Sequence, residues 1–443
     1  MVQLSNDCMA FDGALLSVEQ ALERIKTRKN FSLESQEIPL VDAVHRICAQ
    51  DYRALSNSPA FNNSAVDGYA VCLSEDPEEK APQDKAKAEL VLDIIAQINA
   101  GESADDIDLK HGQAVAIMTG APLPLAANAV YMREDCTVDQ SRGQVTVPYG
   151  LKPKANCRFV GEDVARDTLL LRKGQRISGA DLGLLAQQGY SAVLVYNKPR
   201  ILLLSSGDEV VSAPDDKRQD QAPKELEAGK IFDSNQTLLH SYLRSWGFEV
   251  TSGGLIADRE EALAQALNSK HLAVQNFDLI VTTGGASMGD KDFIKPALQR
   301  LGQLDSWRLA IKPGRPVIIG SIDNALFLGL PGNPVAAFVT ALLLVYPLKW
   351  LLSDCPAPAL QTQKVKANFS YKKKAGRREF VRARLIDSSK SAQGSVMAEK
   401  FPKEGAGMLS SLAWAQGLVI LDEERLAVEP NQSLDFLAFN SIY

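Results

Sequence analysis

The stretch "FDLIVTTGGASMGDKDFIKPAL", residues 277–298, decides the fold of this chain. Residues 277–281 have the composition of a buried strand, three glycines lie in the loop that follows, and a helix is expected over residues 292–301. Strand, glycine-rich turn and helix alternate in the same way across residues 200–351. This alternation predicts a doubly wound sheet, parallel in the main, whose ligands bind beyond the carboxyl ends of its strands.

The length of 443 residues exceeds what one hydrophobic core usually supports, so several domains are expected. We predict an α/β multidomain protein. Its parts are a central doubly wound α/β domain, a β-rich insertion domain, a discontinuous helical linking segment and a small C-terminal β-barrel-like domain. The α/β domain covers residues 198–355 and the insertion domain residues 51–154. The linking segment covers residues 14–50 plus 155–197, and the C-terminal domain covers residues 356–443. The N-terminal helix, over residues 17–29 with Ser17 as its N-cap, is expected to pack against residues 152–195.

Composition excludes several classes of protein. A net charge of −6 argues against bulk attraction to nucleic acid or to an anionic membrane, so any anion site must be local. Six cysteines without a Cys-x-x-Cys pair, together with four scattered histidines, argue against a disulfide framework and structural zinc. No signal-peptide pattern is visible, and Pro347 and Lys349 interrupt the apolar helix expected within residues 336–352. A cytoplasmic protein without a membrane partner is expected.

Three glycine-rich turns follow expected strands of the α/β domain: "SSGDE" at 205–209, the opening loop, and "GLPGNPVAA" at 329–337. Such turns expose backbone N–H groups, and the helix that follows adds positive potential at its N-terminus. Together they predict a cradle for phosphate, although each alone could be an ordinary turn between strand and helix. None is a Walker loop or the dinucleotide fingerprint.

Carboxylates lie inside these loops, at Glu209, Asp290 and Asp292. They would repel an anionic substrate unless a divalent cation bridged them, which favours Mg²⁺-assisted phosphate chemistry. The alternative is that Asp290 and Asp292 only cap the helix that follows them. Asp258 also lies just before a helix and could likewise be only its cap.

The segment "IKPGRP", residues 311–316, places Lys312 and Arg315 on either side of a Pro-Gly turn. It is either an anion clamp whose direction is fixed by rigid prolines or a surface hairpin with two solvated cations. The segments "SPAFNNSAVDGYAV" (58–71) and "AIMTGAPLP" (116–124), taken by themselves, indicate only turn-rich loops.

Ten segments, in order along nearly the whole chain, resemble the molybdopterin molybdenumtransferase family, the MoeA proteins and the E domain of gephyrin. They are "FNNSAVDGYAV", "IMTGAPLP", "CRFVGEDV", "LLLSSGDEV", "GKIFDSN", "DLIVTTGGASMGDKDFIK", "LAIKPGRPV", "GLPGNPVAAF", "GRREFVRARL" and "GMLSSLAWAQGLVIL". The resemblance implies the last step of molybdenum cofactor synthesis. Adenylylated molybdopterin binds, AMP is lost with Mg²⁺ as cofactor, and molybdate is placed on the dithiolene sulfurs. It also implies a homodimer with a shared cleft, and transfer contacts with other proteins of the pathway.

The resemblance also implies roles for particular residues. The front part of the chain, which faces the partner's cleft in this family, contributes Asp67, Thr119, Arg158 and Asp163. The acidic candidates for metal binding or phosphoanhydride cleavage are Glu209, Asp258 and Asp292. The pyrophosphate and pterin loop is Gly284, Gly285, Ser287 and Gly289. The molybdate clamp is Lys312 and Arg315, joined by Arg382 and Ser411, and further cofactor-binding positions are Pro313, Gly314, Pro331, Gly332 and Asn333.

This sequence departs from the family pattern at a few positions, with Arg315 for a usual Lys and Asn62 for a usual Asp. Two other functions are weighed against the transferase. A molybdopterin adenylyltransferase shares the "GG-x-S-x-G" loop, but it is usually the α/β domain alone. A scaffold that has lost catalysis would have lost charged site residues, whereas Asp67, Glu209, Asp292 and Lys312 are all present.

Overall fold

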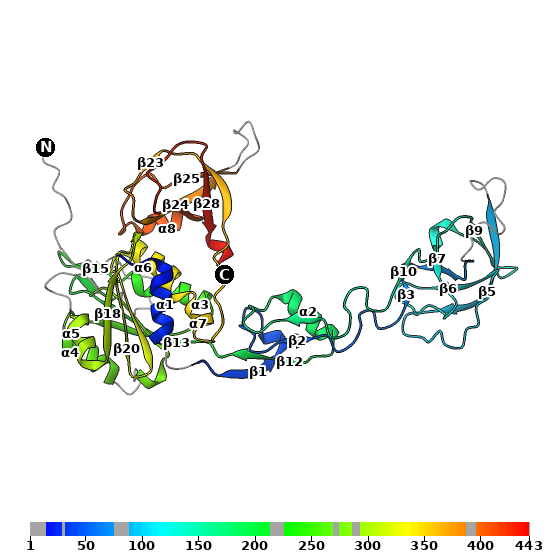
Figure 1. Cartoon of the computed structure of the whole chain (residues 1–443), viewed down its shortest axis with the longest axis horizontal. Helices are drawn as coiled ribbons and strands as arrows, with labels where there is room; N and C mark the ends of the chain where they lie inside the picture. The colour runs from blue at the N-terminus through cyan, green and yellow to red at the C-terminus, as the bar shows by residue number, and fades with distance from the viewer. Residues whose placement is uncertain are drawn as a thin grey trace, which may run out of the picture.

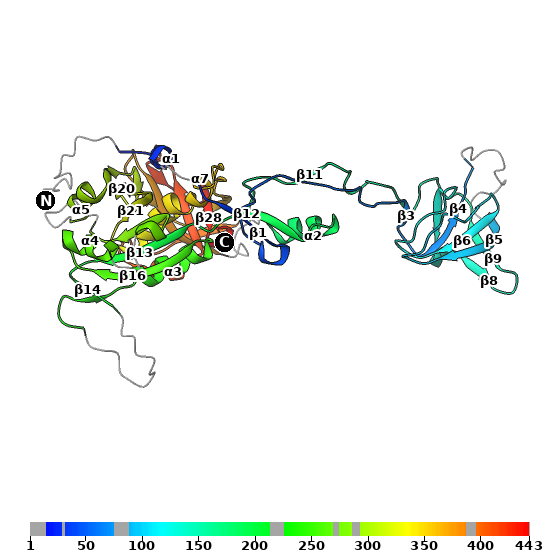
Figure 2. The same ribbon diagram turned by 90° about the horizontal axis from the view of Figure 1, so that it is seen from below.

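The computed structural model describes residues 15–28, 32–74, 88–212, 226–268, 274–285, 293–386 and 396–442. The molecule is elongated (Figures 1 and 2). An α/β unit and a β-barrel lie together at one end, a slender middle segment follows, and a separate β-sheet lies at the far end.

The α/β unit is built on a six-stranded sheet of order β16-β13-β17-β21-β20-β18. The parallel strands are β16 (Glu249–Ile256), β13 (Arg200–Ser206), β17 (Leu279–Thr283) and β21 (Ala325–Leu330). The antiparallel strands are β20 (Pro316–Ile322) and β18 (Gln303–Arg308). The predicted mainly parallel sheet is confirmed, whereas β18 was not predicted. The carboxyl ends of the parallel strands lie at one edge, as the site prediction requires.

Helices cover both faces of this sheet because neighbouring residues of a strand point to opposite sides. Ile201 and Leu203 pack with α3 (Asn235–Ser245) and α6 (Pro334–Thr340). Leu202 and Leu204 pack instead with α4 (Glu260–Asn268) and α5 (Ile294–Leu301). A small parallel pair, β14 (Val210–Val211) and β15 (Ile231–Phe232), extends from the end of β13. The doubly wound architecture is therefore confirmed.

The apolar helix that begins at α6 continues through a π-helical stretch (Ala341–Val345) to α7 (Leu348–Leu351). Residues 334–351 are long and apolar enough to span a membrane by length and composition, but 89% of this window is buried inside the protein. Burial of this kind is what the core helix of a globular unit requires, and the helix packs in the larger apolar cluster of the α/β unit.

Helix α1 (Val18–Arg28) has the predicted cap, since Ser17 Oγ accepts a hydrogen bond from the Gln20 N–H at 3.1 Å. Its predicted packing is wrong. Ala21 and Ile25 are buried in the core of the α/β unit, next to β20 and the π-helical stretch, rather than against residues 152–195. The segment after α1, not the helix itself, joins that unit, because β1 (Ser35–Pro39) pairs with β12 (Ala192–Tyr196).

The middle segment contains the β1–β12 pair, η1 (Leu40–Asp42), and α2 (Gly179–Gln187). Ser178 and Asp181 form a capping box at the start of α2. Two antiparallel pairs lead outward: β2 (Tyr52–Arg53) with β11 (Leu169–Leu171), and β3 (Asn63–Ser64) with β10 (Cys157–Arg158).

The distal sheet has the order β7-β4-β6-β5-β9-β8. Its strands are β4 (Gly68–Val71), β5 (Glu89–Ile98), β6 (Gln113–Ile117), β7 (Ala129–Met132), β8 (Thr137–Asp139) and β9 (Gln144–Pro148), with η2 (Arg133–Asp135) after β7. The β-rich character predicted for this part is confirmed. Strand β5 was not predicted, and residues 75–87 just before it lie outside the described residues.

The C-terminal unit is a closed barrel of five strands, because β24 pairs with both β25 and β26. The strands are β22 (Gln363–Ala367), β24 (Arg378–Ile386), β25 (Met397–Lys400), β26 (Gly417–Leu421) and β28 (Ser433–Ala438), all predicted within a few residues. Minor elements are β23 (Tyr371–Lys372), β27 (Ala427–Val428), α8 (Leu409–Trp414) and η6 (Phe439–Ser441). A two-residue strand of the α/β unit, β19 (Ile311–Lys312), pairs with the start of β24, so the "IKPGRP" loop is joined to the barrel.

Candidate active site

A pocket of about 280 Å³ lies where the α/β unit meets the barrel. Five predicted residues of the α/β unit line it: Lys312, Pro313, Gly314, Pro331 and Asn333. The barrel contributes the predicted Arg382 and, in addition, Tyr371, Glu379, Lys400, Lys403 and Glu404. Segments that are far apart in the sequence thus form one cavity rich in charged side chains.

Lys312 is held by groups of the barrel. Its Nζ donates to the Tyr371 hydroxyl at 3.0 Å and to Glu379 Oε2 at 3.3 Å, and the Tyr371 hydroxyl donates to the same carboxylate oxygen at 2.7 Å. Burial lowers the pKa of Lys312, but the hydrogen bond to Tyr371 and the charge of Glu379 outweigh this effect, so the pKa lies above its ordinary value. Lys312 is therefore a firmly charged cation of the pocket.

Arg382 is buried, with a relative exposure of 9%. Its Nε donates to Ser411 Oγ at 3.0 Å and one terminal nitrogen donates to the Gly405 carbonyl at 3.1 Å. No carboxylate of the described residues forms an ion pair with it. A guanidinium stays charged even when buried, and a buried charge without a counter-ion is costly. The pocket therefore offers Arg382 to an anion from outside the chain.

Arg315 is placed differently from its predicted partner Lys312. It is not among the residues that line the pocket, and its buried Nε has no hydrogen-bond partner among the described residues. The structure therefore brings Lys312 together with Arg382 and, through it, Ser411, but it does not bring Arg315 to the same cavity.

The glycine-rich turns meet at the carboxyl edge of the sheet. Gly284 has a φ of +91°, and a Cβ there would lie 2.2 Å from the Ser206 carbonyl oxygen. Only glycine fits this approach. Gly332, in the turn after β21, lies beside Gly284. Gly285, with a φ of +61°, follows in the same turn. The remaining predicted residues of this loop, Ser287, Gly289, Asp290 and Asp292, lie outside the described residues.

Asn235 joins these turns and was not predicted from the sequence. It lies at the start of α3 and is buried; its amide nitrogen donates to Thr283 Oγ1 at 2.7 Å and to the Gly332 carbonyl at 2.6 Å. The turns after β17 and β21 are therefore held in a fixed relation. Only its place in the quoted segment "GKIFDSN" could have drawn notice to it.

The acidic candidates form a cluster at the end of β13. Asp258 Oδ2 accepts a hydrogen bond from the Asp208 N–H at 3.2 Å. Burial raises the pKa of Asp258, and the neighbouring charges of Asp208 and Glu209 raise it further. Its other oxygen, Oδ1, is buried and has no hydrogen-bond partner within the part of the chain that the structure describes. A buried carboxylate oxygen among like charges is suited to a cation.

A complete metal centre is nevertheless not formed by the described residues alone. Within them, no group of three or more His, Cys, Asp or Glu side chains is arranged to hold a metal ion. Asp292, the third predicted metal ligand, lies outside the described residues.

The candidates of the front part lie far from this cleft within one chain (Figures 1 and 2). Asp67 Oδ1 accepts hydrogen bonds from the backbone N–H and the hydroxyl of Thr119, at 2.8 and 2.7 Å. These bonds lower the pKa of Asp67. Arg158 lies opposite Asn63 in the β3–β10 pair, and the Asp163 N–H donates to the Ser58 carbonyl at 3.0 Å, nearer the middle segment.

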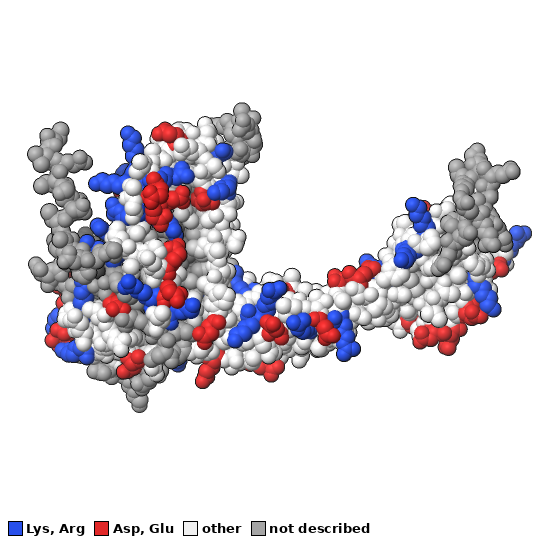
Figure 3. All heavy atoms as spheres, viewed as in Figure 1, with Lys and Arg blue, Asp and Glu red and all other residues white. Residues whose placement is uncertain are grey.

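Charge is mixed over the surface. On the face drawn in Figure 3, acidic and basic side chains alternate along the barrel and the α/β unit, without a broad field of one sign. This agrees with the expectation that anion binding is local.

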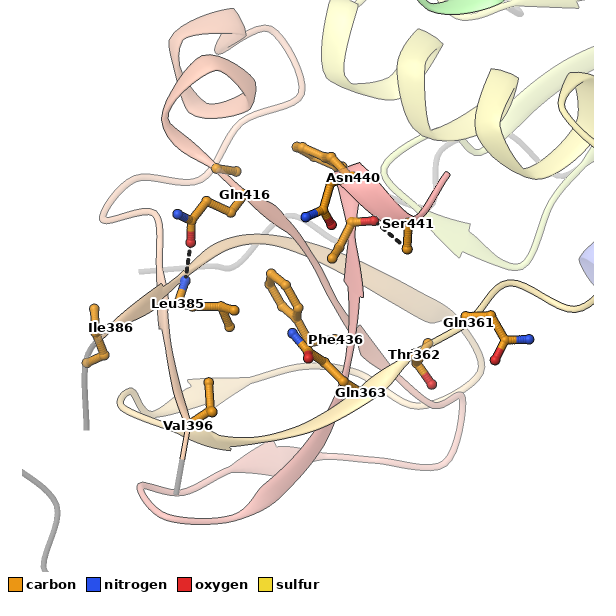
Figure 4. Close-up of a pocket in the computed structure, with 13 residues that line it drawn as sticks. Gln361, Thr362, Gln363, Leu385, Ile386, Val396, Gln416, Phe436, Asn440 and Ser441 are labelled. Atoms are coloured by element: carbon orange, nitrogen blue, oxygen red, sulfur yellow. Dashed lines mark hydrogen bonds between the residues drawn. The ribbon is translucent and has the colours of Figure 1, made fainter. Parts of the chain in front are cut away.

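A second hollow, of about 940 Å³, lies on the barrel (Figure 4). None of the described residues that line it is charged; they include Leu385, Val396, Gln416 and Phe436, and Gln416 Oε1 accepts a hydrogen bond from the Leu385 N–H. Among the described residues, then, the hollow offers no charged group to pair with an oxyanion. The pocket around Lys312 and Arg382 is therefore the candidate site.

Comparison with known families agrees with this architecture. Residues 16–189 match the MoeA N-terminal region (domain I and II), residues 202–350 a probable molybdopterin binding domain, and residues 364–439 the MoeA C-terminal region (domain IV). Fold and site thus define a multidomain biosynthetic protein built around a molybdopterin-binding domain.

Comparison with individual proteins identifies the family to which the chain belongs. The molybdopterin molybdenumtransferase of Haemophilus influenzae is 32% identical over 437 residues, covering 97% of this chain and 100% of that one. The molybdopterin molybdenumtransferase of Bacillus subtilis is 29% identical and covers 91% and 90%. The crystal structure of a molybdopterin biosynthesis moea protein from Pyrococcus horikosii, 28% identical, superposes with a TM-score of 0.70 over 96% of this chain and 99% of that one. The chain belongs to the MoeA family of molybdopterin molybdenumtransferases, enzymes of molybdenum cofactor biosynthesis.

Proposed function

We propose that this enzyme inserts molybdate into adenylylated molybdopterin, with release of AMP, and that molybdate binds in the pocket between the α/β unit and the barrel. The observation that carries this proposal is the buried Arg382 guanidinium, which has no carboxylate partner among the described residues and lines the same cavity as Lys312. A dianion between these two cations would supply the missing counter-charge.

The glycine turns at the sheet edge are the proposed cradle for the pyrophosphate and pterin parts of the substrate. Gly284, Gly285 and Gly332 leave backbone free of side chains there, and Asn235 fixes their spacing. Ser287 and Gly289 are proposed to continue the cradle. Pro331 and Asn333 belong both to this edge and to the anion pocket, so the two substrates would meet there.

Magnesium is proposed at the acidic end of the cleft. The buried, unpartnered Oδ1 of Asp258 and its neighbour Glu209 fit a divalent cation, and Asp292 is the proposed third ligand. When bound, Mg²⁺ would neutralise charge that develops on the phosphoanhydride during cleavage. With Mg²⁺ between them and the phosphates, these carboxylates would fix the phosphate end of the substrate at the acidic end of the cleft. The pocket with Arg382 and Lys312 would then stay free for molybdate.

The active enzyme is proposed to be a homodimer. Asp67, Thr119, Arg158 and Asp163 lie on an arm that reaches away from the chain's own cleft (Figure 1), so a second copy would have to bring them to it. Cytoplasmic location, and receipt of the substrate from another protein of the pathway, belong to the same proposal.

Release of AMP tests the function. Purified protein should release AMP from adenylylated molybdopterin only when molybdate and Mg²⁺ are present, and Lys312→Ala should abolish this molybdate-dependent release. Robust ATP-dependent adenylylation of molybdopterin by the protein would instead assign the adenylyltransferase activity. Unchanged AMP release by Lys312→Ala and Asp67→Ala would refute the site.

A further inference from the structure

A buried carboxylate lies in a pocket proposed to bind an anion, and it contacts one of the two cations directly. We propose that Glu379 sets the affinity of this pocket for its oxyanion: it offsets part of the charge of Lys312, so that the pocket holds a tetraoxo dianion loosely enough to transfer it. This inference rests on the proposed function, since it concerns the same pocket.

The fold fixes the contact between the two residues. Strand β19 runs parallel to the start of β24, with Lys312 opposite Glu379. Glu379 Oε2 lies 3.3 Å from Lys312 Nζ, and the same oxygen accepts the Tyr371 hydroxyl at 2.7 Å. The side chain of Glu379 is 4% exposed. The pair thus comes from two different folding units, and the carboxylate cannot turn away to water without disrupting the barrel.

The formal net charge of the side chains that line the pocket is suited to a dianion. The cations are Lys312, Arg382, Lys400 and Lys403, and the carboxylates are Glu379 and Glu404. Among the described residues that line the pocket, four positive and two negative side chains leave a formal excess of two positive charges. A dianion would neutralise the pocket, whereas removal of Glu379 would leave an excess that favours any anion more strongly.

The two carboxylates contact the same ammonium group but differ in burial. Glu404 lies 3.7 Å from Lys312 Nζ and is 58% exposed. Water and salt screen an exposed charge, whereas a buried charge acts through a medium of lower effective dielectric constant. Glu379 should therefore control the affinity of the pocket, and Glu404 should affect it little.

Loose binding is useful here because the oxyanion must leave the pocket for the dithiolene sulfurs. Interactions that hold the bound substrate and the transition state equally raise affinity without raising kcat. Interactions that hold the substrate more tightly than the transition state slow its transfer. Glu379 would lower the affinity for the resting oxyanion while leaving Arg382 free to bind it.

The test compares Glu379→Gln with Glu404→Gln in the full-length protein. Gln keeps the size of the side chain and an oxygen that can accept from Lys312 and Tyr371, but it removes the charge. Equilibrium dialysis with molybdate at low ionic strength should give a Kd about tenfold lower for Glu379→Gln than for the wild type, and a change of less than about twofold for Glu404→Gln. Because the oxyanion would be held more tightly, molybdate-dependent AMP release by Glu379→Gln should be slower at saturating molybdate, and a rate equal to that of the wild type would contradict the proposal.

A second variant covers the case in which Glu379→Gln does not fold. Tyr371→Phe keeps the carboxylate charged but removes the hydroxyl that stabilises it, so more of the charge of Glu379 acts on the pocket, and molybdate should bind about threefold more weakly. Circular dichroism establishes that each variant is folded. Unchanged or weaker binding by folded Glu379→Gln would overturn the proposal, as would tighter binding by Tyr371→Phe.

Failure of this inference can be told from failure of the proposed function. If Arg382→Ala and Lys312→Ala bind molybdate as the wild type does, the pocket is not the molybdate site. If both lose binding while Glu379→Gln binds like the wild type, the pocket is correct and only the role of Glu379 is refuted.

Discussion

The two ends of the cleft carry opposite charge: carboxylates lie together at one end, and a buried guanidinium lies at the other. At the edge of the α/β sheet, Asp208, Glu209 and Asp258 lie together, and Asp258 keeps a buried oxygen without a partner. Under the barrel, Arg382 is buried without a carboxylate partner among the described residues, while Lys312 is held by Glu379. The acidic end is suited to a cation and the basic end to an anion. A substrate with a metal-bound phosphoanhydride and a separate oxyanion fits both.

The largest expected effect is at the basic end. Arg382→Ala removes the buried guanidinium and should weaken molybdate binding by about 100-fold or more, because a charge-assisted contact in a desolvated pocket is lost. Equilibrium dialysis measures it. Arg384→Ala is the matched control: Arg384 lies on the same strand, is 44% exposed and pairs with Glu399. Its loss should leave the Kd unchanged, and equal losses for both variants would remove the distinction between the two arginines.

The acidic end should respond in catalysis rather than in molybdate binding. Glu209→Gln should lower the rate of AMP release by about 10- to 100-fold, since a carboxylate that supports the phosphoanhydride step is removed, while the Kd for molybdate stays within about twofold. Glu249→Gln, at the opposite end of the same sheet, serves as the control. Loss of molybdate binding in Glu209→Gln would show that phosphoanhydride cleavage and molybdate binding are not divided between the two ends of the cleft.

Mixing two inactive variants sharpens the comparison between the cleft and the distal arm. Asp67→Ala changes the arm and Lys312→Ala the cleft, so a mixed dimer has one site with both changes and one intact site. Refolding an equal mixture should restore about a quarter of the wild-type AMP release. A mixture as inactive as each variant alone would contradict a site shared between two copies.

Two lysines test how far a carboxylate partner matters: the Lys312 side chain is 43% exposed, whereas Lys349 is buried. Lys312 has Glu379, whereas Lys349 donates only to the Trp246 carbonyl, at 2.7 Å, among the described contacts. Burial, together with Arg176, lowers the pKa of Lys349 to about 7. In the unfolded chain Lys349 takes up its proton below about pH 10.4, and in the folded chain only below about pH 7. The free energy of unfolding therefore falls as the pH falls from about 10.4 to about 7. Lys349→Met should raise Tm at pH 7 by a few degrees. No rise would show that the contacts of the Lys349 ammonium with the Tyr346 and Trp350 rings, at 4.5 and 4.4 Å from the ring centroids, offset the cost of its burial.

The smallest effect concerns Asp67. Its pKa is lowered by the two hydrogen bonds from Thr119. Thr119→Val removes the hydroxyl bond and keeps the backbone one, so the pKa should rise part of the way to its ordinary value. A carbon-detected NMR titration of the Asp67 carboxyl between pH 2 and 6 measures the change. An unchanged midpoint would mean that the backbone N–H alone sets this pKa.

Much of the fold could be predicted from the sequence because its signals are local. The strand over Leu279–Thr283, the Ser17 cap and the five barrel strands each follow from a run of residues with a definite pattern. The packing of α1 could not be predicted this way. Its apolar face identifies a buried helix, but the choice between two cores depends on tertiary contacts with β20. The domain boundaries stay predictions.

Lys312 was proposed from its place in the "IKPGRP" segment and Arg382 only from the family resemblance, and the structure brings both to one pocket. Glu379 and Tyr371 were missed because a charged residue beside Arg378 in a strand is normally taken to be exposed. The structure shows instead that the β19–β24 pairing buries Glu379. Arg315 lies in the same turn as Lys312 but does not line the pocket, so its proposed role in the anion clamp stays a prediction.

The most direct test of the central claim is a crystal structure of the protein grown with molybdate, with the metal located by its anomalous scattering. A single strong peak is expected between the Lys312 ammonium and the Arg382 guanidinium, and it should be lost in crystals of Arg382→Ala. A peak elsewhere in the wild-type protein, with the pocket between barrel and α/β unit filled only by water, would contradict the claim.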